Sequence, residues 1–75
     1  MLKLRIEVNM AKGTVKWFNK DKGFGFIAPD EGGRDIYVQA SNVETPDQSL
    51  GDGQRVEYEL AMGRKGPEAT HVKGL

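Results

Sequence analysis

The sequence predicts an all-β domain of five short antiparallel strands closed into a small Greek-key barrel. Three observations lead to this fold class. Apolar and polar residues alternate in several short runs, and no stretch has the spacing of an amphipathic helix. Ten glycines and three prolines suit a chain with many tight turns. With 75 residues the chain is a single small domain, so its strands need curvature and closure to bury their edges.

The first two expected strands flank a short polar turn. Residues 12–19 form the first strand, because β-branched and aromatic side chains dominate this stretch. A turn over residues 19–23 leads into the second strand, residues 24–28. In the first strand Val15 and Trp17 would share a face unless a bulge intervenes. The sequence therefore does not decide which side chains of this strand point inward.

The other three expected strands follow longer or glycine-rich connections. The third covers residues 35–39 and comes after a Pro-Asp-Glu-Gly-Gly loop. The connection over residues 40–54 is long for a hairpin and has room for a turn of helix. Clean alternation over residues 55–60 predicts a fourth strand with one wet face. A loop at residues 63–67 then precedes a fifth strand at residues 69–73.

The alternation within these strands predicts which side chains fill the barrel. Successive side chains of a strand point to opposite faces, so every second residue shares the inward side. The expected core consists of Val15, Ile27, Ile36, Val38, Val56, Tyr58, Leu60 and Val72.

The second and third strands carry apolar side chains on both faces. Phe24 and Phe26 share one face, while Ile27 occupies the other and points to the core. Tyr37 likewise lies opposite the inward residues of its strand. A chain this small has no second layer to cover these rings, so we expect them to be exposed. Exposed rings interleaved with lysines can stack bases of single-stranded nucleic acid beside their phosphates.

The charge distribution agrees with this interpretation, although the net charge is zero. Residues 1–27 carry six cations and two anions, whereas residues 28–75 carry five cations and nine anions. The cationic half therefore coincides with the aromatic half, and one face can be electropositive. Uneven charge on an ordinary solvated surface is the alternative.

Several other classes of function are excluded or disfavoured. The chain has no cysteine and a single histidine, His71, so we expect no disulfide, no metal site and no cofactor. Asp30 and Glu31 are adjacent in a glycine-rich turn and do not form a positioned acid–base pair, so we expect no enzyme. No apolar run approaches the roughly 20 residues that span a membrane, and no signal peptide is evident. A cytoplasmic protein is the expectation.

Two motifs in order resemble a known family. Residues 13–19 read Gly-Thr-Val-Lys-Trp-Phe-Asn, residues 22–27 read Lys-Gly-Phe-Gly-Phe-Ile, and residues 66–69 read Gly-Pro-Glu-Ala. Together these segments look like a bacterial cold-shock protein over residues 12–75. The resemblance implies a five-stranded oligonucleotide-binding (OB) barrel that holds single-stranded RNA and DNA. In this family the usual roles are melting RNA structure, as an RNA chaperone, and regulating transcription or translation.

The resemblance also implies positions for the binding site. Its stacking, cationic and base-edge positions fall on Lys16, Trp17, Phe18, Lys22, Phe24, Phe26, Tyr37, Gln39 and Lys65. The chain departs from the family pattern where Gln39 and Ala40 replace a histidine and an aromatic, and the following loop lacks its usual aromatic. We therefore expect a shortened track of about three or four nucleotides.

Residues 1–9 form an N-terminal extension ahead of an expected cold-shock domain over residues 10–75. Leu2, Leu4, Ile6 and Val8 alternate with polar residues, which is the pattern of a half-buried strand. Such a strand can pair with its own barrel or with a neighbour's to give a homodimer, or the segment is a disordered tail. The alternative function is a protein-interaction barrel with weakened nucleic-acid binding that oligomerises through this strand.

Overall fold

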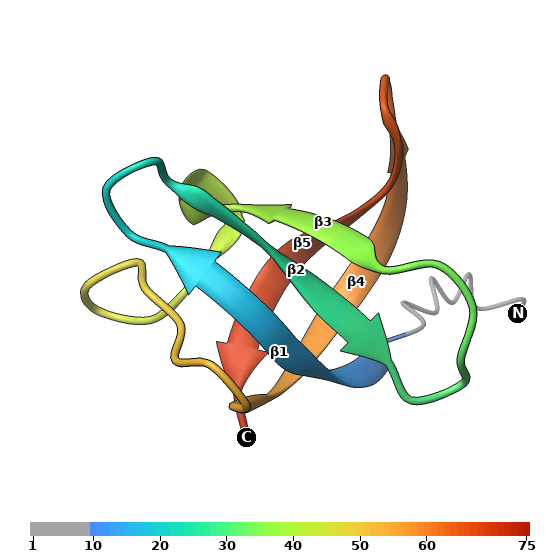
Figure 1. The fold of residues 1–75 in the computed structure, drawn as a ribbon, viewed down its shortest axis with the longest axis horizontal. Helices are drawn as coiled ribbons and strands as arrows, with labels where there is room; N and C mark the ends of the chain where they lie inside the picture. Colours follow the sequence, from blue (N-terminus) through green and yellow to red (C-terminus); the bar gives the residue numbers. More distant parts are fainter. Residues whose placement is uncertain (1–9) are drawn as a thin grey trace, which may run out of the picture.

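Five strands and one short 3-10 turn make up the part of the chain that the computed structural model describes, residues 10–75 (Figure 1). The predicted extension of residues 1–9 lies outside this part. The elements are β1 (Met10–Asn19), β2 (Phe24–Pro29), β3 (Ile36–Gln39), η1 (Ala40–Asn42), β4 (Arg55–Gly63) and β5 (Gly66–Gly74). Among these elements no helix is long and apolar enough to cross a membrane.

The strands close into a barrel in the order β1-β2-β3-β5-β4, which confirms the predicted fold class. Four of the seams are antiparallel, and the seam between β3 and β5 is parallel. A closed ring with an odd number of strands cannot alternate direction at every seam, so one parallel seam is required. In this barrel the parallel seam lies where Tyr37 pairs with Glu68 and Val38 with Ala69.

The expected boundaries of the last two strands need correction. The predicted loop at residues 63–67 is too long, because β4 continues to Gly63 and β5 starts at Gly66. The two strands are paired as far as Gly63 and Gly66, which leaves a two-residue turn at the tip of an arm that projects from the barrel (Figure 1). Gly66 has a φ of 121°, which a residue with a side chain rarely adopts. The predicted turn of helix after β3 is confirmed as η1.

The core is close to the one expected. It contains Val15, Ile27, Ile36, Val38, Val43, Leu50, Val56, Tyr58, Ala69 and Val72. Of the predicted core residues only Leu60 is wrong, because its side chain is 52% exposed. Leu60 lies where β4 leaves the barrel to form the projecting arm. Val43 and Leu50 come from the long connection between β3 and β4, which has no strand periodicity from which burial can be read.

Candidate nucleic-acid interface

A bulge in β1 decides which side of the barrel Trp17 occupies. Val15 pairs with Ile27 and Trp17 with Phe26, so Lys16 is an extra residue on β1 between two consecutive positions of β2. An extra residue inverts the alternation of the side chains that follow it. Val15 therefore points into the core and is 1% exposed, whereas Trp17 points outward and is 41% exposed. The strand thus contains the bulge whose presence the sequence did not decide.

The strand register then places four aromatic rings on one outer face. Trp17 of β1 is opposite Phe26 of β2, which is opposite Tyr37 of β3. Phe24 lies two residues before Phe26 and shares its face. These four residues, which we call the aromatic platform, come from three adjacent strands. Three of them are half-buried by their neighbours and Trp17 is exposed.

The rings of the aromatic platform contact one another. The Trp17 ring centroid is 5.4 Å from those of both Phe24 and Phe26, with interplanar angles of 70° and 62°. Tyr37 is 5.8 Å from both Phe24 and Phe26. Edge-to-face pairs at such distances stabilise the rings in fixed orientations. The platform is therefore organised before any ligand arrives, although the rings' outer surfaces remain open to solvent.

Phe18 is not brought to this platform. Its side chain is partly buried and packs against the core. It lies over Gly25, where an added Cβ would be 2.7 Å from the Phe18 Cα and would also collide with the Trp17 carbonyl oxygen. A glycine at position 25 therefore lets β1 and β2 approach closely and gives the Phe18 ring its space. The predicted stacking role of Phe18 gains no support from this placement.

Tyr37 links the platform to two polar side chains. The amide nitrogen of Gln39 donates a hydrogen bond of 3.2 Å to the Tyr37 hydroxyl. The ammonium of Lys65, at the tip of the projecting arm, lies 5.9 Å from the centre of the Tyr37 ring, within the range of a cation–π contact. The turn between β4 and β5 thus brings Lys65, one of the predicted site residues, to the platform.

The two predicted cations near β1 are placed differently. Lys16 forms an ion pair of 3.1 Å with Asp35, and both side chains are about half exposed. Exposed ion pairs of this kind stabilise a protein by only about 0–1 kcal/mol, so the Lys16 ammonium can leave Asp35 and bind another anion. Lys22 is exposed in the turn between β1 and β2, where its backbone N–H donates to the Asn19 side chain.

Two shallow hollows adjoin the platform at Tyr37. One has a volume of about 260 Å³ and is lined by Tyr37, Gln39, Arg64, Lys65, Gly66, Pro67 and Glu68. The other is of similar size and is lined by Phe24, Phe26, Arg34, Asp35, Tyr37, Lys65 and Pro67. No pattern in the sequence marks Arg34 and Arg64 as site residues, because both lie in turns, where strand alternation does not predict the direction of a side chain.

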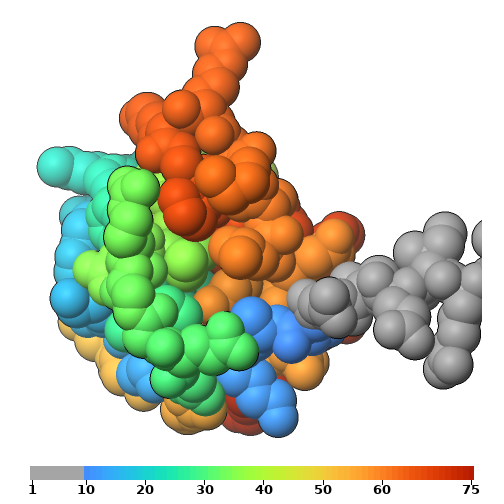
Figure 2. All heavy atoms as spheres, turned by 90° about the vertical axis from the view of Figure 1, so that its right-hand side faces the viewer, coloured from blue at the N-terminus to red at the C-terminus, as the bar shows by residue number. Residues whose placement is uncertain are grey.

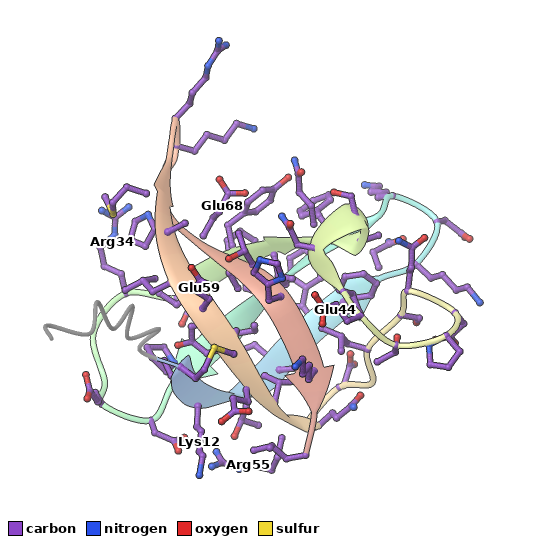
Figure 3. All side chains as sticks on the ribbon, turned by 180° about the vertical axis from the view of Figure 1, so that it is seen from behind. Lys12, Arg34, Glu44, Arg55, Glu59 and Glu68 are labelled. Atoms are coloured by element: carbon purple, nitrogen blue, oxygen red, sulfur yellow. The ribbon has the colours of Figure 1, made fainter. Side chains whose placement is uncertain are left out.

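Other charged side chains lie away from the platform. Glu44 and Glu59 flank β5 in the view from behind (Figure 3), and His71 Nδ1 lies 2.8 Å from a Glu44 carboxylate oxygen. At the end of the barrel where β1 and β4 meet, Arg55 donates two hydrogen bonds of 2.6 and 2.7 Å to Asp30. These bonds lower the pKa of Asp30 and raise that of Arg55. Burial raises the pKa of the Tyr58 hydroxyl.

A closed five-stranded barrel with exposed rings on β1, β2 and β3 defines the OB-fold class of nucleic-acid-binding barrels. Known proteins narrow the class to one family. A sequence model of the 'Cold-shock' DNA-binding domain matches residues 11–75, so the chain belongs to the cold-shock domain family.

Relatives in bacteria match over most of the chain. Cold shock-like protein CspE of Escherichia coli (strain K12) is 51% identical over 65 residues, which are 85% of this chain and 94% of that protein. The probable cold shock protein A of Mycobacterium tuberculosis is 48% identical over 67 residues, 88% of this chain and all of that protein.

A solved structure supports the fold independently. The Drosophila Unr CSD456 structure superposes with a TM-score of 0.77 over 91% of this chain, at 19% sequence identity. This chain spans 27% of the length of that one. At this level of identity the likeness concerns the fold alone.

Proposed function

We propose that this chain binds single-stranded RNA and DNA with low sequence specificity by stacking bases on its aromatic platform. The observation that carries the proposal is the connected cluster of four rings on the outer face of β1, β2 and β3, in which Phe24 and Phe26 contact each other and both remaining rings. Membership in the cold-shock family supports nucleic-acid binding as the class of activity. Stacking accepts every base, because every base has a flat π surface, and this accounts for low specificity.

Cations around the platform would contact the phosphates. Lys22 and Lys65 lie at two ends of it, and Arg34 lines the hollow beside Phe24 and Phe26. Lys16 would exchange its exposed partner Asp35 for a phosphate. Each phosphate neutralised on a single strand steepens the dependence of log K on log salt by roughly 0.7, so binding should weaken as salt rises.

The length of the track follows from the number of rings. Four rings accommodate about three or four bases, since each base needs one aromatic surface. Beyond Tyr37 the chain presents Gln39 and then Ala40, neither of which stacks like an aromatic ring. Gln39 can instead hydrogen-bond a base edge, although its amide is already engaged with the Tyr37 hydroxyl.

In the cell, we propose that the protein acts as an RNA chaperone or as a regulator of transcription or translation. The proposal rests on its family and on a short, unspecific track, which suits transient contact with many transcripts. A cytoplasmic location and action as a monomer or a strand-mediated homodimer go with this role. Nothing in the proposed activity requires a cofactor or a catalytic group.

Fluorescence of Trp17 during titration with short oligothymidine, at low and moderate salt, tests the proposal. Trp17 is the only tryptophan, so the signal comes from the platform itself. We expect saturable quenching whose midpoint moves to higher oligonucleotide concentration as salt rises. An unchanged spectrum of the folded protein would reject the proposal in favour of a protein-interaction barrel. The exposed Leu60 and Met62 on β4 would then be the first surface to examine for a protein partner.

A further inference from the structure

A larger, apolar groove opens on another side of the barrel. Figure 2 looks onto this side, where the start of β1, the β2–β3 loop and β4 come together. The groove has a volume of about 560 Å³, within the range of pockets that bind ligands. Its apolar lining consists of Met10, Ala11, Pro29, Ile36, Tyr58, Leu60 and Pro67. Lys12, Asp30, Glu31, Gly32 and Arg34 complete it.

Leu60 shows that this groove is uncovered within residues 10–75. It lies on the same side of β4 as Val56 and Tyr58, which are 0% and 1% exposed, yet Leu60 itself is 52% exposed. The three residues follow the alternation of an inward strand face. Leu60 pairs with the buried Ala69 at the base of the projecting arm, so within residues 10–75 the inward face of β4 continues there without a layer that covers it.

The chain outside the described part begins at the lip of this groove. Residues 1–9 join at Met10, which lines it, and they carry four alternating apolar side chains: Leu2, Leu4, Ile6 and Val8. A straight continuation of β1 would not bring these four side chains into the groove. Met10 pairs with Glu59 and Ala11 with the buried Tyr58, so continuing this register puts Val8 and Ile6 on the outer side with Glu59. Asn9, a residue that favours turns, stands directly before Met10.

We propose that residues 1–9 turn back at Asn9 and bind their apolar side chains in this groove of their own barrel. The tether is a single residue long, and short tethers give effective concentrations of about millimolar. A second copy of the chain at micromolar concentration would therefore compete poorly with the tethered segment for the groove. Nucleic acid is disfavoured because the lining is mostly apolar and its rim has no excess of cations, with Lys12 and Arg34 balanced by two carboxylates. The groove contains none of the platform's rings and shares only Arg34 and Pro67 with the hollows beside them, and the inference does not depend on nucleic-acid binding.

A double-mutant cycle in the full chain tests the contact. Ile6→Asp and Leu60→Asp are made singly and together, and the equilibrium constant for folding is measured by denaturant unfolding at a concentration where sedimentation shows monomer. Met62→Asp is the matched control, because Met62 lies on the same side of β4, is 76% exposed and is not part of the groove lining. We expect each of Ile6→Asp and Leu60→Asp to lower the folding constant about tenfold, as for half-burying an aliphatic side chain.

The pattern of coupling then decides the proposal. The double variant Ile6→Asp/Leu60→Asp should fold about as well as either single variant, whereas Ile6→Asp and Met62→Asp should multiply their effects. Multiplicative effects for Ile6 and Leu60, or no effect of Ile6→Asp, would overturn it. Coupling that appears only at concentrations where a dimer forms would also overturn it, since the occupant would be a second copy.

Discussion

Replacing Phe24 by leucine should separate the platform's role in binding from its role in folding. Leucine keeps an apolar side chain at a half-buried position but removes the π surface. Stacking is worth roughly 1–3 kcal/mol per base by alanine substitution, so Phe24→Leu should weaken oligothymidine binding by about 5-fold to 150-fold. The free energy of unfolding should also fall, by at most about 0.5–1.5 kcal/mol for each of the three aromatic pairs that Phe24 makes.

Phe18→Leu is the matched control, because it makes the same chemical change one strand away. The Phe18 ring packs against the core over Gly25, so its loss should destabilise the fold and leave oligonucleotide affinity nearly unchanged. Affinity would be measured by fluorescence anisotropy of a labelled dT oligomer, and stability by urea unfolding. Equal losses of affinity for the two variants, each still folded, would refute the assignment of stacking to the outer rings.

Three further predictions address neighbouring features. Gln39→His should raise oligothymidine affinity severalfold in the same anisotropy assay, because an imidazole stacks beyond Tyr37; unchanged affinity would show that the track ends at Tyr37. Gly25→Ala should lower the free energy of unfolding by about 1–3 kcal/mol through a collision with the backbone of β1, whereas Gly51→Ala, where an added Cβ has room, should not. Because Arg55 lowers the pKa of Asp30, the folded state binds fewer protons than the unfolded state near the ordinary value of 3.8. Stability should therefore fall as the pH drops from that value toward the lowered pKa, and Asp30→Asn should flatten this dependence in acid unfolding; an equally steep profile in the variant would contradict it.

Much of the fold could be predicted because its signals are local. Residue propensities, turn signals and alternation together located all five strands, and alternation put Phe24 and Phe26 opposite Ile27 without any knowledge of the barrel. The sequence also showed that β1 needs a bulge if Val15 is to point into the core and Trp17 outward, because regular alternation would put both on the same face. Its presence depends on how β1 pairs with β2, which is a tertiary fact.

The errors arise where position in the barrel overrides local pattern. Leu60 has the parity of a core residue, but its strand outruns the barrel at that point. Val43 and Leu50 are buried from a connection that has no periodicity, so no local signal marks them. Arg34 reaches the platform from a glycine-rich loop, and the partner of Lys16 depends on a contact between residues 19 positions apart.

The most direct test of the central claim is an NMR titration of the aromatic side chains of the full chain with a four-residue oligothymidine. Ring resonances of Trp17, Phe24, Phe26 and Tyr37 should shift together and saturate at one equivalent. Those of Phe18, which packs against the core, and of the buried Tyr58 should stay in place. Shifts centred on Phe18 or Tyr58, or no shifts in the platform at saturating oligonucleotide, would contradict the account.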